Sequence, residues 1–188
     1  MSLNRKDFLK KACVSGACLC GFGGFVSAMA DENIQNHNEP EPDSGKTLIQ
    51  AWTATLVDNL NSELEPEMVR KLVKKGSAIH YNDLKMDEML KEYIGQPEKF
   101  MQFISEKWGW VITFDKATGV LIADENKSYC VCPVVNQANH IGSTAMCYCS
   151  EGFAEKMFSV VFQRAVKAEV ISSVLRGNAS CKYKITIS

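Results

Sequence analysis

The hydrophobic pattern of this chain changes its period once, near Gly109, and this change restricts the fold more than any other feature. Before Gly109, apolar residues recur at helical spacing. One such stripe repeats at four-residue steps and consists of Leu48, Trp52, Leu56 and Leu60. After Gly109, short β-rich runs take over, beginning with 110–114 and 120–123. Helices followed by antiparallel strands predict an α+β fold in which N-terminal helices pack on one face of an antiparallel sheet.

The positions of Pro and Gly predict where the individual elements begin and end. Helices are expected over 48–60, 66–76, 83–93 and 97–108, with Pro66 and Pro97 at first helical positions and Gly76 and Gly109 at ends. The C-terminal half is expected to form a hairpin, a helix and a second hairpin. Its expected strands are 110–114, 120–123, 129–135, 145–148, 168–175 and 181–187, with Ser150 capping the helix.

Residues 1–30 have the pattern of an export signal. A basic segment at 4–10 precedes a weakly apolar stretch, and Ala28-Met29-Ala30 gives the small-x-small pattern of a cleavage site. The Arg5-Lys6 pair resembles a twin-arginine signal, with Sec export as the alternative and a lipoprotein anchor less favoured. Residues 31–46 are expected to be a polar disordered tether and 47–188 a single domain. The predicted location is periplasmic or extracellular.

The charge of the exported part argues against two classes of partner. The whole chain has a net charge of −1, and four basic residues and one acidic residue leave with the signal, so the remainder carries −4. Mild acidity disfavours binding to nucleic acid or to an anionic membrane surface. The apolar run in the signal is also too short and too rich in Gly, Ser and Cys for stable membrane insertion.

Two Cys-x-Cys pairs are the strongest candidate for a functional site. Residues two apart on a strand point to the same face. If the strands expected at 129–135 and 145–148 are neighbours, the sulfurs of both pairs would converge on one patch. These residues are Cys130, Cys132, Cys147 and Cys149, and Cys181 near the C-terminus is the fifth cysteine after the signal.

Three kinds of chemistry remain open for this patch. The four paired cysteines could bind Zn²⁺, with Cys181 as a candidate fifth ligand and His140 as a substitute for one sulfur. In an oxidising compartment they could instead form disulfides, although five cysteines cannot all pair within one chain. Cys149 could also be a nucleophile, because a helix N-terminus lowers the pKa of a thiol. The candidate bases are His80, His140 and Glu151.

The last 60 residues resemble a known group of small domains. The resemblance rests on residues 130–133 (CVCP), 147–153 (CYCSEGF) and 170–185, which ends in Cys181-Lys182-Tyr183-Lys184-Ile185. These segments are similar to the L-2-amino-thiazoline-4-carboxylic acid hydrolase-like family and to the 4-vinyl reductase domain. The resemblance implies an α+β domain with a pocket between helices and sheet. It also implies small-molecule binding, with Cys132, Cys147, Cys149 and Cys181 as candidate site residues.

Together, these patterns predict an exported domain that binds a small molecule or a metal ion, with zinc as the candidate metal, at its cysteine patch. The hydrolase name suggests a second interpretation, a thiol- or zinc-dependent enzyme that cleaves a C–N bond in a small amide or thiazoline. A third is a non-catalytic extracytoplasmic domain stabilised by disulfides. Trp108 and Trp110, which flank Gly109, are expected to pack in the core.

Overall fold

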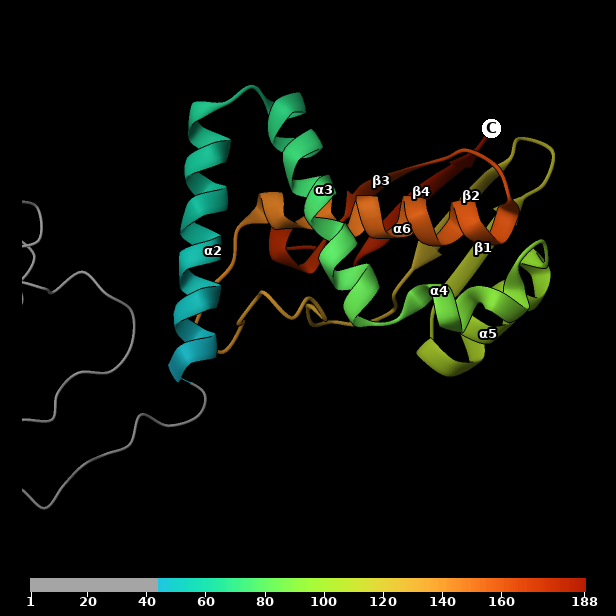
Figure 1. The fold of residues 1–188 in the computed structure, drawn as a ribbon, viewed down its shortest axis with the longest axis horizontal. Coiled ribbons are helices and arrows are strands. Elements are labelled where there is room, and N and C mark those ends of the chain that lie inside the picture. The colour runs from blue at the N-terminus through green and yellow to red at the C-terminus, as the bar shows by residue number, and fades with distance from the viewer. Residues whose placement is uncertain (1–43) are drawn as a thin grey trace, which may run out of the picture. The chain divides into compact units, whose positions relative to one another are not determined.

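Helices precede strands along the chain, as predicted, in the computed structural model, which describes residues 44–188 (Figure 1). The export signal and most of the tether lie outside the described residues. The helical segments are α2 (Ser44–Glu63), α3 (Pro66–Asp83), α4 (Met86–Met89), η1 (Leu90–Tyr93), α5 (Pro97–Trp108), η2 (Thr144–Met146), α6 (Cys147–Phe162) and η3 (Val174–Arg176). The strands are β1 (Val111–Asp115), β2 (Val120–Asp124), β3 (Val166–Ser172) and β4 (Lys182–Ile187).

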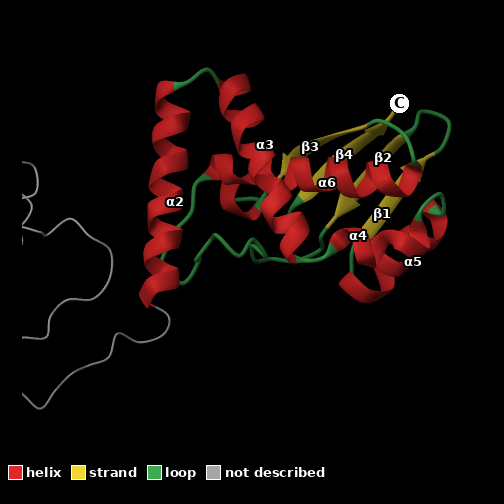
Figure 2. Ribbon diagram, in the orientation of Figure 1, coloured by secondary structure: helices red, strands yellow, loops and turns green. Residues whose placement is uncertain are grey.

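The four strands form one antiparallel sheet in the order β1-β2-β4-β3. Both predicted hairpins are present, and the C-terminal strand β4 joins them by pairing with β2, with Tyr183 opposite Ala123. Helix α6 lies across one face of the sheet and α3 packs on α6 (Figure 2). The core between these layers includes fully buried Phe100, Leu121 and Phe158. The α+β prediction with hairpin, helix and hairpin is therefore confirmed.

Helix α2 is present, but its predicted apolar stripe does not face the protein. Leu48 and Trp52 are 70% and 65% exposed, whereas Gln50, Ala54 and Val57 are buried. The buried face of α2 contains both apolar and polar side chains. It packs against η2 and against the loop at Pro133, whose backbone carbonyl accepts a hydrogen bond from Gln50. The helix begins at Ser44, so the last three residues of the expected tether are helical.

Several element boundaries also differ from the prediction. Gly76 does not end α3, which continues to Asp83, and the helix expected over 83–93 is divided into α4 and η1. In contrast, α5 runs from Pro97 to Trp108, and Gly109 ends it with a φ of 73°, where glycine is favoured. None of the helices described within 44–188 has the length and apolarity needed to cross a membrane.

The two predicted strands that carry the Cys-x-Cys pairs are absent. Residues 129–135 form an irregular loop, in which Pro133 cannot donate a backbone hydrogen bond to a sheet. Residues 145–148 span the end of η2 and the first residues of α6. The two strands were wrongly predicted because a Cys-x-Cys motif spans only three residues, which is too few to distinguish a strand from a helical turn.

Candidate functional site: a cavity lined by five cysteines

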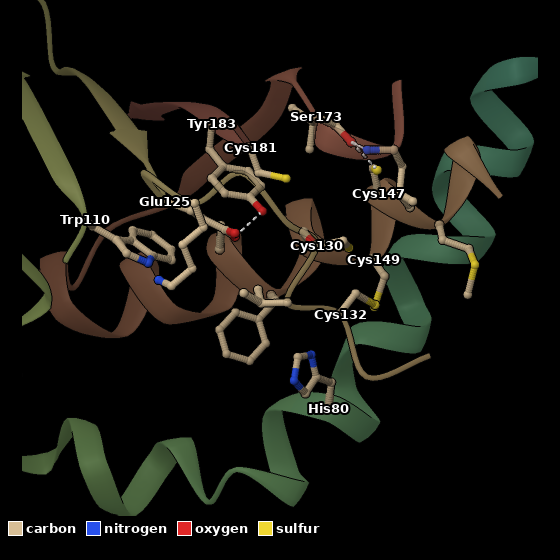
Figure 3. A pocket seen from close by; sticks show the side chains of 18 of the residues that line it. His80, Trp110, Glu125, Cys130, Cys132, Cys147, Cys149, Ser173, Cys181 and Tyr183 are labelled. Atoms are coloured by element: carbon tan, nitrogen blue, oxygen red, sulfur yellow. Dashed lines mark hydrogen bonds between the residues drawn. The ribbon is translucent and has the colours of Figure 1, made fainter. Parts of the chain in front are cut away.

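All five cysteines of the described residues line one cavity of about 510 Å³ (Figure 3). They come from three separate parts of the chain. Cys130 and Cys132 lie in the loop after β2, Cys147 and Cys149 lie in the first turn of α6, and Cys181 precedes β4. The convergence of the cysteines is thus present, although it does not arise from paired strands as expected.

The loop that carries Cys130 and Cys132 is held mainly by side chains. Gln50 of α2 donates from Nε2 to the carbonyl oxygen of Pro133 at 2.8 Å, and its Oε1 accepts from Asn136 Nδ2 at 3.2 Å. The backbone N–H of Cys130 donates to Gln137 Oε1 at 2.8 Å. Gln50 is buried, so its amide replaces the hydrogen bonds that a neighbouring strand would have supplied.

The second pair is positioned by the start of α6. Ser143, and not Ser150 as predicted, caps this region, because its Oγ accepts from the backbone N–H of Ala145 at 3.3 Å. The following turn leads directly into Cys147, whose Sγ lies 2.9 Å from Ser173 Oγ. Since residues two apart on a helix do not share a face, Cys147 and Cys149 line different parts of the cavity wall.

Burial raises the pKa of all five thiols. It raises that of Cys130 to about 12 and that of Cys132 to about 11. The pKa values of Cys147, Cys149 and Cys181 are raised for the same reason. For Cys149 this shift is opposite in direction to the one expected from a helix N-terminus, and its cause is burial. The thiols are therefore protonated at neutral pH.

The arrangement of the sulfurs bears on the metal and disulfide interpretations. All five cysteines are free thiols in the structure. Within residues 44–188, no three His, Cys, Asp or Glu side chains form a group that could hold a metal ion. Tetrahedral zinc needs four ligand atoms at about 2.0–2.3 Å, so the thiols as placed here do not fit this ion without movement.

Only one of the three candidate bases lines the cavity. His80 does so from α3, where its ring lies 5.1 Å from that of Phe153 and burial lowers its pKa. His140 is exposed in the loop after Cys132. Glu151 is buried and does not line the cavity; it accepts two hydrogen bonds from Arg70, at 2.7 and 2.9 Å, and one from the backbone N–H of Val170 at 2.9 Å. It joins α6 to α3.

One end of the cavity contains residues that the sequence analysis did not select. Glu125 follows β2 directly and is buried, and its Oε1 accepts from the Tyr183 hydroxyl at 2.6 Å. Loss of solvation raises the pKa of both groups. Trp108 and Trp110 pack against the core, as expected, and both also line the cavity, with Trp110 beside Tyr183. The two-residue spacing of Cys181 and Tyr183 was the available signal, because it places both on one face of the last strand.

Solved structures with some likeness to this chain include two proteins of known ligand state. A trafficking protein particle complex subunit 3 from Naegleria fowleri, covalently bound to palmitic acid, is 10% identical, with a TM-score of 0.46 over 76% of this chain and 94% of that one. The phenol-responsive sensory domain of the transcription activator PoxR, with phenol, is 15% identical, with a TM-score of 0.43 over 73% and 74%. No curated protein matches. The model of a family of unknown function, DUF6144, matches residues 27–188, and the chain therefore belongs to this family.

Proposed function

We propose that this protein is an exported domain that binds a small, largely apolar molecule in the cysteine-lined cavity. The observation that carries the proposal is the cavity itself, which has a volume of about 510 Å³ and a wall made mostly of apolar, aromatic and sulfur-bearing side chains. Ligand sites typically have volumes of 300–1,000 Å³ and combine such a wall with a few polar groups. The polar side chains that line the cavity are those of His80, Lys107, Glu125, Lys127, Ser150, Ser173 and Tyr183.

Two features of the sequence support the same proposal. The resemblance of the C-terminal segments to 4-vinyl reductase domains implies small-molecule binding. The pattern of residues 1–30 supports export. The hydrolase alternative is less favoured, since burial raises the pKa of every thiol, that of Cys149 included.

Uptake of Nile red, a neutral dye that fluoresces in apolar surroundings, tests the proposal. We expect saturable binding to the full chain and its loss in Cys132→Trp, which places an indole in the cavity. Ile171→Trp is the matched control, because Ile171 is exposed on β3 and does not line the cavity. Val131→Trp, at the exposed edge of the cavity, gives a second blocking variant should Cys132→Trp fail to fold. Equal binding by wild type and both folded cavity variants would refute the proposal.

A thiophilic metal ion is the second candidate ligand, favoured by the meeting of five thiols in one cavity. The loop of Cys130 and Cys132 is the part that would have to move toward Cys147 and Cys149, and it contains little regular hydrogen bonding. Elemental analysis of the purified protein, with parallel counting of free thiols, tests this candidate. About one zinc per chain, lost in Cys147→Ser, would support it, whereas a metal-free protein with five free thiols would exclude it.

A further inference from the structure

The cavity has two chemically different ends. Trp110, Glu125 and Tyr183 are grouped at one end, apart from Cys147 and Cys149 at the other (Figure 3). The first end is built by the sheet, because Trp110 directly precedes β1, Glu125 directly follows β2 and Tyr183 is the second residue of β4. A ligand that fills the cavity would therefore meet the thiols of Cys147 and Cys149 at one end and, at the other, the Glu125 carboxylate with the Cys181 thiol beside it.

One oxygen of the Glu125 carboxylate is available to a ligand. Its Oε1 accepts from the Tyr183 hydroxyl, whereas Oε2 accepts from no described residue in 44–188. Among the described residues, every side-chain oxygen or nitrogen that is fully buried has a hydrogen-bond partner. Because Oε2 has none, it is not fully buried and is accessible to solvent or to a ligand. The accessible space that Glu125 lines is this cavity, although the residue is only 6% exposed. An ionised carboxylate can only accept hydrogen bonds, so it selects for a donor.

The aromatic rings beside Glu125 favour a cationic donor. The rings of Trp110 and Tyr183 are stacked with centroids 6.1 Å apart and planes inclined by 20°, and Trp108 lies 5.5 Å from Trp110. The faces of such rings attract ammonium groups. Lys127 opposes this preference in part, because its charge offsets that of Glu125, and Lys107 adds a second ammonium group to the cavity wall. Its ammonium is held by the Trp108 carbonyl oxygen at 2.8 Å.

From this arrangement, and resting on the proposed function, we infer that the ligand is a small organic amine with an apolar body. Its ammonium group donates to Glu125 Oε2 beside the aromatic rings, and its body extends toward the cysteines. An anionic ligand would place a second negative charge next to a carboxylate that is already poorly solvated. A neutral alcohol could donate to Glu125 but would lose the cationic attraction.

Displacement of Nile red by three matched compounds tests the inference. Phenethylamine, phenethyl alcohol and phenylacetate share one ring and differ mainly in the charge of the polar group. We expect the amine to displace half of the dye at a concentration about tenfold lower than phenylacetate and about threefold lower than the alcohol. Dye binding with equal or better displacement by the alcohol or by phenylacetate would overturn the inference and leave the proposed function standing. Absence of dye binding would refute the proposed function, and the inference with it.

Two substitutions connect the selectivity to Glu125. Glu125→Gln keeps an oxygen that accepts from Tyr183 but replaces the free acceptor by an amide donor, so the preference for the amine over phenylacetate should fall to about threefold or less. Lys127→Met removes the opposing ammonium and should increase this preference. An unchanged ratio in a folded Glu125→Gln protein would contradict the role of Glu125, even if the amine remained the best ligand.

Discussion

Helix α6 contacts α3 at Gly152, and this contact predicts that Gly152→Ala destabilises the protein, although helix propensity alone predicts stabilisation. Replacing Gly by Ala inside a helix normally stabilises it by about 1 kcal/mol. At Gly152, however, an added Cβ would collide with the carbonyl oxygen of Lys74 and would lie 2.6 Å from Ser77 Oγ and 3.1 Å from the carbonyl carbon of Lys74. Ser77 can rotate away, but the α3 backbone cannot, so the two helices must separate.

The cost of this separation exceeds the gain in propensity. Overpacking a close contact costs about 1–3 kcal/mol, and the high end applies when backbone must move. After subtracting about 1 kcal/mol for propensity, we expect Gly152→Ala to lower the free energy of unfolding by about 2 kcal/mol. For a domain of this size the melting temperature should fall by roughly 6–8 °C.

Gly76 is the matched control for this substitution. It also lies inside a helix, but nothing lies within 4 Å of an added Cβ. Gly76→Ala should therefore raise the free energy of unfolding by about 0.5–1 kcal/mol. Urea denaturation followed by circular dichroism measures both variants. If Gly152→Ala is as stable as wild type or more so, the close packing of α3 on α6 is wrong. The positions of His80 relative to Cys147 and Cys149 would then be wrong as well, since these helices carry them.

Three further predictions concern other parts of the molecule. Arg70→Met leaves the Glu151 carboxylate, which is 1% exposed, with only the Val170 N–H and a distant Lys74 as partners. It should lower the free energy of unfolding, measured by urea denaturation, by about 3 kcal/mol, and a loss below about 1 kcal/mol would contradict a buried ion pair. Burial raises the pKa values of the cysteine thiols, so iodoacetamide at pH 8 should alkylate the folded, reduced protein at least about tenfold more slowly than the urea-unfolded chain. Equal rates would show that the thiols are solvated. If residues 1–30 are a cleaved signal, mass spectrometry of the protein recovered from the producing cells should find Asp31 at its N-terminus, and an uncleaved chain would disprove the signal.

Elements with strong local patterns could be predicted from the sequence. Helix α5 is bounded by Pro97 and Gly109, and the first hairpin is marked by β-rich runs on either side of Gly119. Both depend on residues close together in the chain, so periodicity and turn chemistry are sufficient to identify them. The exposed stripe of α2 shows where this reasoning fails. Apolar spacing identifies a helix, but tertiary contacts decide which of its faces is buried.

The candidate site was predictable only in part. The four cysteines of the two Cys-x-Cys pairs lie within one segment of twenty residues. Any compact arrangement of that segment brings them close together, so their convergence could be predicted. The local structure of the segment could not, because the hydrogen bonds that fix it come from Gln50, about eighty residues away. The pair of Glu125 and Tyr183 is similarly non-local, because its members are 58 positions apart in the sequence. No sequence pattern specifies such a partner until the pairing of β2 with β4 is known.

The same non-local bonds suggest which wall of the cavity can adjust to a ligand. Glu125 and Tyr183 are fixed by the sheet. The backbone N–H of Glu125 donates to the Cys181 carbonyl oxygen at 2.9 Å, and Tyr183 of β4 is paired with Ala123 of β2 and Val170 of β3. Cys130 and Cys132 instead depend on a few side-chain bonds from Gln50 and Gln137. A rigid polar end and a less constrained sulfur end would let one carboxylate select the head of a ligand while the loop adapts to its body. Gln50→Leu should therefore weaken Nile red binding more than it alters the preference among the three phenyl compounds, and the reverse result would place the selectivity in the loop.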